Sequence, residues 1–230
     1  MNKFLIALFV IAAIQSSLTL PLDNENAVQS LKDTQRYKLI EDAYGNFQKS
    51  LWPVEVFPSM LNYIKDLKKW SENDAALKNS PQHVSLRQSI GKCLELLEKL
   101  ATDADNCELQ ISLRTEHERL KKLFKSQENH KLQEGWLMKY ADMMLVMRPI
   151  LKKSSEKFHL WLATTVQTFI NSLDANGKQE NDDILHWYEK FAKEDDDIRQ
   201  HILAIEFMGL FPDERPILEA KCKIQFANNF

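Results

Sequence analysis

Glycine is scarce in this chain of 230 residues. The sequence contains five glycines, and neighbouring glycines lie more than 30 residues apart. Domains rich in β-structure use glycine freely in their turns, and phosphate-binding loops need several glycines close together. The scarcity therefore argues against a β-rich fold and excludes a glycine-rich phosphate loop. The seven prolines are spread along the chain, which favours long helices joined by short connections.

Long apolar runs are absent apart from one at the start of the sequence. A lysine precedes an apolar run over residues 4–14, which is too short to cross a bilayer as a helix. Ser17 and Thr19 place small residues at positions −3 and −1 of a cut before Leu20. The pattern predicts a signal peptide over residues 1–19 and a secreted, extracellular protein. A short membrane anchor and a buried core helix are the alternatives. No later run is long enough for a transmembrane helix, so the protein is not expected to span a membrane.

Cysteine is also scarce, and its number is odd. Cys93, Cys107 and Cys222 predict one disulfide and one free thiol, or a disulfide-linked dimer through the odd cysteine. If two helices form a hairpin around residues 102–106, Cys93 and Cys107 are offset by ~12 Å, more than the ~5.5 Å Cα spacing of a disulfide. A bridge from Cys222 to one of the other two is therefore expected, with Cys107 preferred. The spacing matches no zinc motif.

Sequence signatures of catalysis and metal binding are missing as well. No serine lies in a Gly-x-Ser-x-Gly turn, and no two histidines are spaced to share one helix face. The acidic segment over residues 174–185 lacks the glycine and the glutamate that a calcium loop needs. The sequence therefore predicts a protein that is not an enzyme and has no metal or cofactor. A hydrolase of unrecognised type, whose polar groups meet only in space, stays open as an alternative.

Charge is unevenly distributed. The whole chain has a net charge of −3, which argues against nucleic acid as a partner. Residues 111–157 are basic, with 11 basic and 6 acidic side chains. The charges could pair with one another across solvated helix faces, or form a face for an anionic partner. The residues predicted for such a face are Arg114, Arg119, Lys121, Lys122 and Lys125.

Helical periodicity extends through the rest of the chain. The most regular stripe steps by four and three residues, through Leu86, Ile90, Cys93, Leu97 and Leu100. Similar stripes precede and follow it, and none has the period of two that a half-buried strand shows. The sequence therefore predicts an all-α fold with one domain over residues 20–230. We expect a single compact bundle of about seven to nine helices.

Residues 136–151 leave few polar positions. A helix that is apolar nearly all round is buried among other helices, so this segment is expected to form a hydrophobic central helix. Pro149 should end or kink that helix at Arg148. Methionine and aromatic residues here and in the next stripe predict ordinary core packing, or a cavity with adaptable walls for an apolar ligand. The predicted cavity residues are Trp136, Met143, Met144, Met147, Trp161 and Phe169.

These features favour binding over catalysis. The leading hypothesis is a secreted, non-enzymatic protein that uses a helical surface to contact a protein or another macromolecule. The alternative is a carrier that holds a small apolar or amphipathic ligand between the central helices. An enclosed apolar void between those helices would favour the carrier, whereas close packing there would exclude it.

Overall fold

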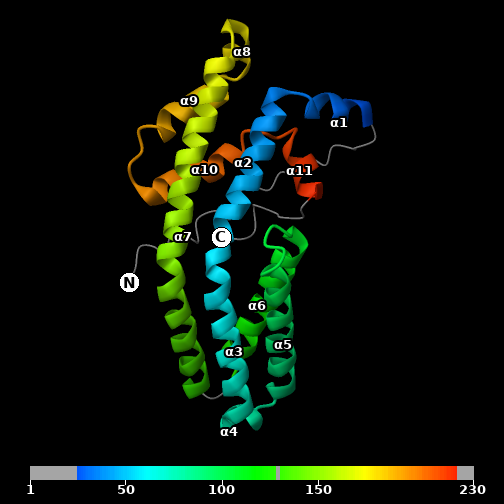
Figure 1. Ribbon diagram of the computed structural model, residues 1–230, viewed down its shortest axis with the longest axis vertical. Helices are drawn as coiled ribbons and strands as arrows, with labels where there is room; N and C mark the ends of the chain where they lie inside the picture. Colours follow the sequence, from blue (N-terminus) through cyan, green and yellow to red (C-terminus); the bar gives the residue numbers. More distant parts are fainter. Residues whose placement is uncertain (1–24, 128–129, 222–230) are drawn as a thin grey trace. The chain divides into compact units, whose positions relative to one another are not determined.

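The computed structural model describes residues 25–127 and 130–221 (Figure 1). This part of the chain is helical and contains no strand, so the predicted all-α class is confirmed. None of its helices combines the length and the hydropathy of a membrane span. The predicted signal peptide, residues 1–19, lies outside the described residues.

The helices fall into two compact units, which we describe separately. Residues 51–154 form one, here called the bundle unit, and the segments on either side, described over 25–50 and 155–221, form the terminal unit. The helix α7 (His130–Ser172) contributes to both. There are more helices than the seven to nine predicted, because short helices such as α4 (Ala75–Lys78) have too few residues to show a period. That residues 20–230 form a single domain stays a prediction.

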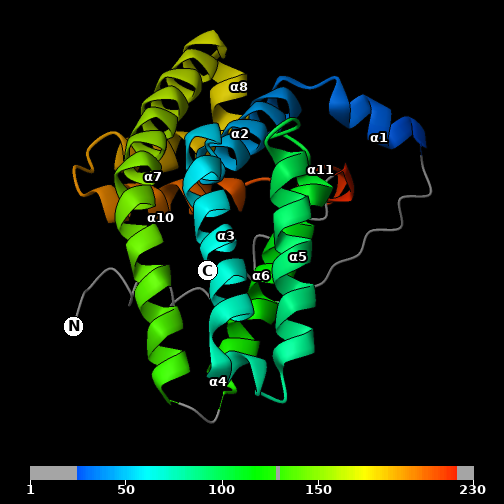
Figure 2. The same ribbon diagram turned by 60° about the horizontal axis from the view of Figure 1, so that its bottom comes forward.

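Four long helices build the bundle unit. Its elements are η2 (Val54–Val56), α3 (Phe57–Asn73), α4, α5 (His83–Leu100), α6 (Cys107–Lys125) and the first part of α7. Helix α5 packs on α3 and on α6. Trp136 connects α7 to two other helices. Its indole N–H bonds the hydroxyl of Tyr63 on α3, and its ring stacks on Phe124 of α6. Both ribbon views show α3 between α5 and α7 (Figures 1 and 2). The stripe predicted on α5 is buried along its whole length.

The first part of α7 differs from its prediction. Trp136, Met143 and Met147 are buried, but the opposite face of the helix is open. The large side chains on that face are exposed to 57% at Leu137, 68% at Met138, 70% at Leu145 and 56% at Val146. The predicted burial on all sides is therefore wrong. A four-helix bundle encloses only one side of each member, so a helix apolar all round must present part of its surface outward.

Helix α7 also continues through Pro149 instead of ending at Arg148. Proline has no N–H group, so it deprives the carbonyl four residues earlier, at Leu145, of its helical donor. Pro149 lies on the exposed side of the helix, where water can hydrate that carbonyl. The helix can thus pass through the proline without burying an unsatisfied group.

The terminal unit is held by an aromatic core and by one arginine. Its elements are α1 (Glu25–Lys32), α2 (Gln35–Leu51), the second part of α7, α8 (Ala175–Glu180), α9 (Asp182–Phe191), α10 (Asp197–Met208) and α11 (Arg215–Lys221). Trp187 of α9 packs on Phe207 of α10, with ring centroids 4.5 Å apart. Arg36 of α2 pairs with Asp183 at 2.8 Å and with the buried Glu214 at 3.4 Å. These contacts fasten α2 to α9 and to the segment before α11.

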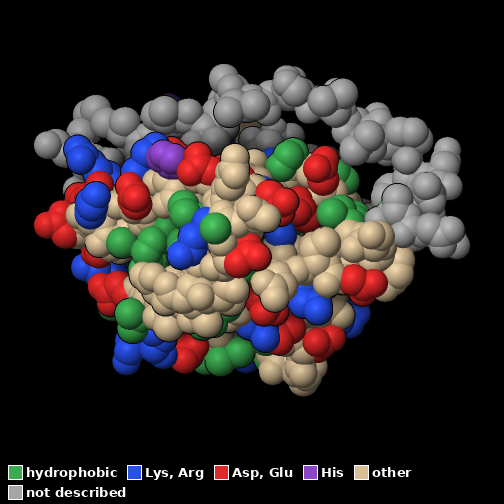
Figure 3. Space-filling model, turned by 90° about the horizontal axis from the view of Figure 1, so that it is seen from above, with side chains coloured by type: hydrophobic (Ala, Val, Ile, Leu, Met, Phe, Trp, Pro, Cys, Tyr) green, Lys and Arg blue, Asp and Glu red, His purple; other side chains and the backbone are tan. Residues whose placement is uncertain are grey.

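The surface carries charges of both signs. On the face drawn in Figure 3, acidic and basic side chains are interspersed and hydrophobic side chains form small separate groups. Several cations pair within their own helix, as in Lys121 with Glu118 at 3.2 Å and Arg215 with Glu219 at 2.6 Å. Such pairs are typical of solvated helix faces and contribute little to stability.

Candidate functional site

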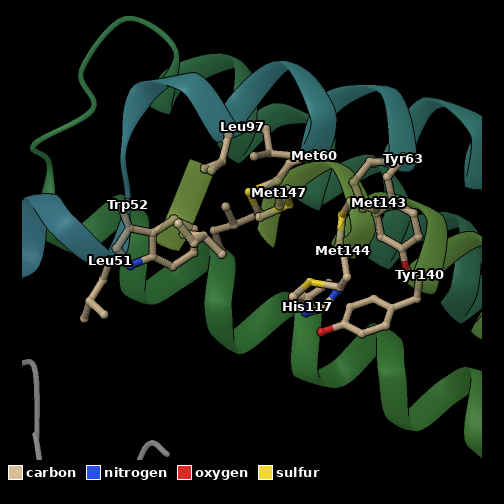
Figure 4. Close-up of a pocket in the computed structure, with 14 residues that line it drawn as sticks. Leu51, Trp52, Met60, Tyr63, Leu97, His117, Tyr140, Met143, Met144 and Met147 are labelled. Atoms are coloured by element: carbon tan, nitrogen blue, oxygen red, sulfur yellow. The ribbon is translucent and has the colours of Figure 1, made fainter. Parts of the chain in front are cut away.

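A pocket of about 180 Å³, partly open to solvent and here called the cavity, lies among the four long helices of the bundle unit (Figure 4). For comparison, a buried apolar cavity of ~150 Å³ is large enough for benzene. The cavity in this protein is lined by Leu51, Trp52, Val56, Met60, Tyr63, Ile64, Leu97, Leu113, His117, Tyr140, Met143, Met144, Met147 and Leu151. The space is therefore sized for a molecule of one ring or of similar bulk.

Methionine forms much of the cavity wall. Met143, Met144 and Met147 project from α7, and Met60 faces them from α3 (Figure 4). Their positions on α7 follow the spacing of one helix face, since residues three and four apart lie on the same side. Methionine is unbranched, flexible and polarisable, so such a wall can change shape around different ligands.

The polar groups gather at one end of the cavity. Figure 4 shows Leu51 and Trp52 at the opposite end from Tyr140 and His117, with the methionines between. The rings of His117 and Tyr140 are stacked with their centroids 5.8 Å apart. Tyr63 lies beside both, at 6.3 Å from the ring of His117 and 6.2 Å from that of Tyr140. Three residues from three helices thus form a polar end on an otherwise apolar space.

The cavity carries no fixed charge. None of the described residues that line it is an aspartate, glutamate, lysine or arginine. Burial lowers the pKa of His117, with Glu118 opposing that shift and Lys121 adding to it. Burial likewise raises the pKa of Tyr140. At neutral pH both side chains are uncharged, so the polar end offers hydrogen bonds rather than an ion pair.

The predicted cavity residues fall in two different places. Met143, Met144 and Met147 line the cavity, and Trp136 is buried next to it. Trp161 and Phe169 belong to the terminal unit, where Trp161 stacks on Phe158. The prediction that all six lie together assumes that their two apolar stripes form neighbouring helices. They lie instead on one continuous helix whose two parts face different cores.

The polar end of the cavity is absent from the sequence predictions. Tyr140 lies four residues after Trp136 and three before Met143, so its place on the inner face of α7 could have been read from the spacing. Tyr63 extends the stripe of α3 in the same way. His117 has the same spacing on α6, four residues after Leu113 and three before Leu120, but spacing does not indicate which helices its ring will face.

A second, wider hollow of about 570 Å³ lies in the terminal unit beside Arg36 and Phe169. The guanidinium of Arg36 already bonds Asp183, Asn181 and the carbonyl of Leu210. Its hydrogen-bonding capacity is thus used to hold the unit together. We assign the hollow a structural origin.

The residues of the predicted anionic-partner face do not share one face of α6. Helical spacing puts Arg114, Lys121 and Lys125 on one side, whereas Arg119 points elsewhere and pairs with Glu116 at 3.0 Å. Lys122 is exposed between these two directions. A basic face for an anionic partner stays a prediction. Within the described ranges, no cluster of three or more acidic, histidine or cysteine side chains could hold a metal ion.

The cysteines are only partly described. Cys93 is free and completely buried in the core of the bundle unit. Its burial, more than the nearby Glu116, raises the pKa of its thiol to about 12. Cys222 lies outside the described residues, so the Cys107–Cys222 bridge stays a prediction.

Comparison of the chain with protein-family models, with curated proteins and with solved structures finds no match in any of the three. Function therefore has to be inferred from the chain's own residues.

Proposed function

We propose that this protein is a secreted carrier that binds a small, uncharged and mostly apolar molecule in the cavity of the bundle unit. The methionine-lined cavity is the observation that carries the proposal. Secretion rests on the signal peptide predicted over residues 1–19. The carrier is the alternative hypothesis from the sequence. The enclosed apolar void that it expects between the central helices differs from this partly open pocket, which is lined by α3, α5, α6 and α7.

The size of the cavity supports a binding role. Protein interiors pack as densely as organic crystals and contain few voids larger than a water molecule. Neutral, flexible walls suit an apolar molecule whose shape need not be matched in advance.

The volume also limits the affinity. A ligand of about eight non-hydrogen atoms, each contributing roughly 0.8 kcal/mol, would bind with a Kd on the order of 10 µM. Such a value suits a carrier that releases its ligand within a fluid.

Native mass spectrometry of the protein secreted by cells tests the proposal. We expect an extra non-covalent mass on the order of 100 Da, the mass of a one-ring molecule of the kind such a cavity holds. The mass should disappear under denaturing conditions. The carrier proposal would be overturned if the native spectrum showed only the mass of the protein without ligand and if no one-ring compound raised the Tm of the protein.

A pair of variants on α7 makes the test specific to the cavity. Met144→Trp fills the space from a lining position and should abolish ligand binding. Met138→Trp places the same new side chain on the exposed face of the same helix and should leave binding unchanged. Equal binding by both variants would place the ligand elsewhere.

A second candidate function is favoured by the exposed face of α7. Leu137, Met138, Leu145 and Val146 place large apolar side chains in solvent over about two and a half turns. Contiguous exposed apolar surface commonly marks an interaction site, and an amphipathic helix can dock in a groove of a partner. This matches the hypothesis of binding through a helical surface. Under it, Leu145→Glu should abolish partner binding and leave ligand binding in the cavity intact.

A further inference from the structure

We infer that the polar end of the cavity selects a ligand with a single hydroxyl or carbonyl group, which bonds Tyr140 and His117. The ligand class is then a neutral one-ring phenol, alcohol or ketone rather than a plain hydrocarbon, a fatty acid or an amine. The inference rests on the proposed carrier function and names the ligand that the same cavity would take.

The first support is the position of these two side chains. Figure 4 shows the hydroxyl of Tyr140 next to the ring of His117, below Met144. The indole nitrogen of Trp52, at the other end, points away from the methionines in the same view. Hydrogen-bonding groups therefore meet at one end of the cavity, and a ligand would be oriented along it.

The second support is that other side chains do not occupy the hydrogen-bonding groups of that end. The hydroxyl of Tyr63 accepts a bond from the Trp136 indole, with 2.8 Å between nitrogen and oxygen. Within the described part of the chain, neither Tyr140 nor His117 makes a side-chain hydrogen bond to another residue. A phenol hydroxyl can donate and accept, and a neutral imidazole offers one donor and one acceptor. The pair can thus satisfy both the proton and the lone pairs of a ligand hydroxyl.

The third support is the absence of a charged residue from the cavity lining. Glu118 and Lys121 act on both His117 and Tyr140, but with opposite effects, and neither is among the described residues that line the cavity. A carboxylate in the cavity would therefore lose its hydration without a counter-ion in direct contact. The same holds for an ammonium group, since no carboxylate lines the cavity. A neutral hydroxyl or carbonyl loses less hydration and finds partners in Tyr140 and His117.

Two probes of equal ring size test the inference, toluene and p-cresol, which differ by one hydroxyl. Their binding to the full-length mature protein is measured by isothermal titration calorimetry at pH 7. We expect Tyr140→Phe to weaken p-cresol binding roughly 3- to 10-fold, the usual value of one hydrogen bond, and to change toluene binding less than about twofold. His117→Phe should act in the same direction and is a second variant if the first does not fold.

A matched control removes a tyrosine hydroxyl that is remote from the cavity. Tyr188 belongs to the terminal unit and donates its hydroxyl to Gln167. Tyr188→Phe should therefore leave the binding of both probes unchanged. Circular dichroism of each variant at the titration temperature shows that it is folded.

The outcomes separate the inference from the carrier proposal. If both probes bind the wild-type protein and neither variant changes their ratio of Kd values, the polar end does not recognise the ligand and the inference is wrong. If neither probe binds the wild-type protein, the inference is wrong, and the native mass spectrum decides separately whether the carrier proposal fails as well. Selective loss of p-cresol binding in Tyr140→Phe and His117→Phe would support both.

Discussion

The indole nitrogen of Trp136 donates a 2.8 Å hydrogen bond to the hydroxyl of Tyr63, and both side chains are buried. The bond joins α7 to α3 next to the polar end of the cavity. Burial raises the pKa of Tyr63, while the bond from Trp136 lowers it. The bond therefore stabilises the bundle and also fixes the ring that Tyr140 and His117 pack against.

Removing the acceptor of this bond should destabilise the bundle unit. Tyr63→Phe leaves the N–H of Trp136 buried without a partner, and we expect a loss of about 1–3 kcal/mol in the free energy of unfolding. Urea denaturation of the full chain measures the change. In the control, Tyr188→Phe removes a hydroxyl from a half-buried pair in the terminal unit and should cost less. An equal effect of the two variants would contradict a special role for the Trp136–Tyr63 bond.

Helical periodicity predicts the inner faces of the long helices because the period and the burial agree. Leu86, Ile90, Cys93, Leu97 and Leu100 form the stripe that fixes the inner face of α5, and all five are buried. The helical period of a sequence predicts which side chains share a face of a helix. It does not predict which other helices pack against that face, since helix packing depends on contacts between residues distant in sequence.

The cavity and the exposed face of α7 show this limit. Tyr63, His117 and Tyr140 come from three helices, and only packing brings their rings within about 6 Å of one another. The sequence also did not predict that Leu145 faces solvent, because an apolar composition does not distinguish a helix at the centre of a bundle from one at its rim.

The thiol of Cys93 should be unreactive in the folded protein. Its side chain is fully buried and its pKa is raised to about 12, so it is rarely a thiolate at pH 8. We expect native labelling by a disulfide reagent to be at least about a thousandfold slower than labelling in urea. A dimer linked through Cys93 is not expected. Stoichiometric labelling under native conditions, or a dimer band on a non-reducing gel that Cys93→Ala removes, would contradict this.

Pro149 should limit the stability of α7. It lies on the exposed side of the helix and offers no N–H to the carbonyl of Leu145. Pro149→Ala supplies that donor and a better helix former, so we expect a gain of about 1–3 kcal/mol in the free energy of unfolding. Ala141→Pro, on the same face, should lose at least as much. A loss of stability in Pro149→Ala would mean that the packing of α7 depends on a bend at the proline.

Mild acid should destabilise the terminal unit through a pair of histidines. The rings of His159 and His201 lie 5.9 Å apart, and Nδ1 of His159 is buried without a hydrogen-bond partner. Burial, with repulsion from His159 as the smaller cause, lowers the pKa of His201 to about 4. Burial also lowers the pKa of His159, against the opposing effects of Gln200, Asp197 and Glu156.

The sign of the pH dependence follows from these two shifts. An unfolded histidine has a pKa of about 6.5, so between pH 6.5 and 4 the unfolded chain binds more protons than the folded one. Stability should therefore fall as the pH falls, by roughly 2 kcal/mol between pH 7 and pH 5 from His201. His201→Phe keeps an aromatic ring beside Phe47 and should flatten this dependence in urea denaturation. Ile40→Val, a non-titrating core change in the same unit, should lower the whole curve without altering its slope. An unchanged slope in His201→Phe would show that other groups cause the acid sensitivity.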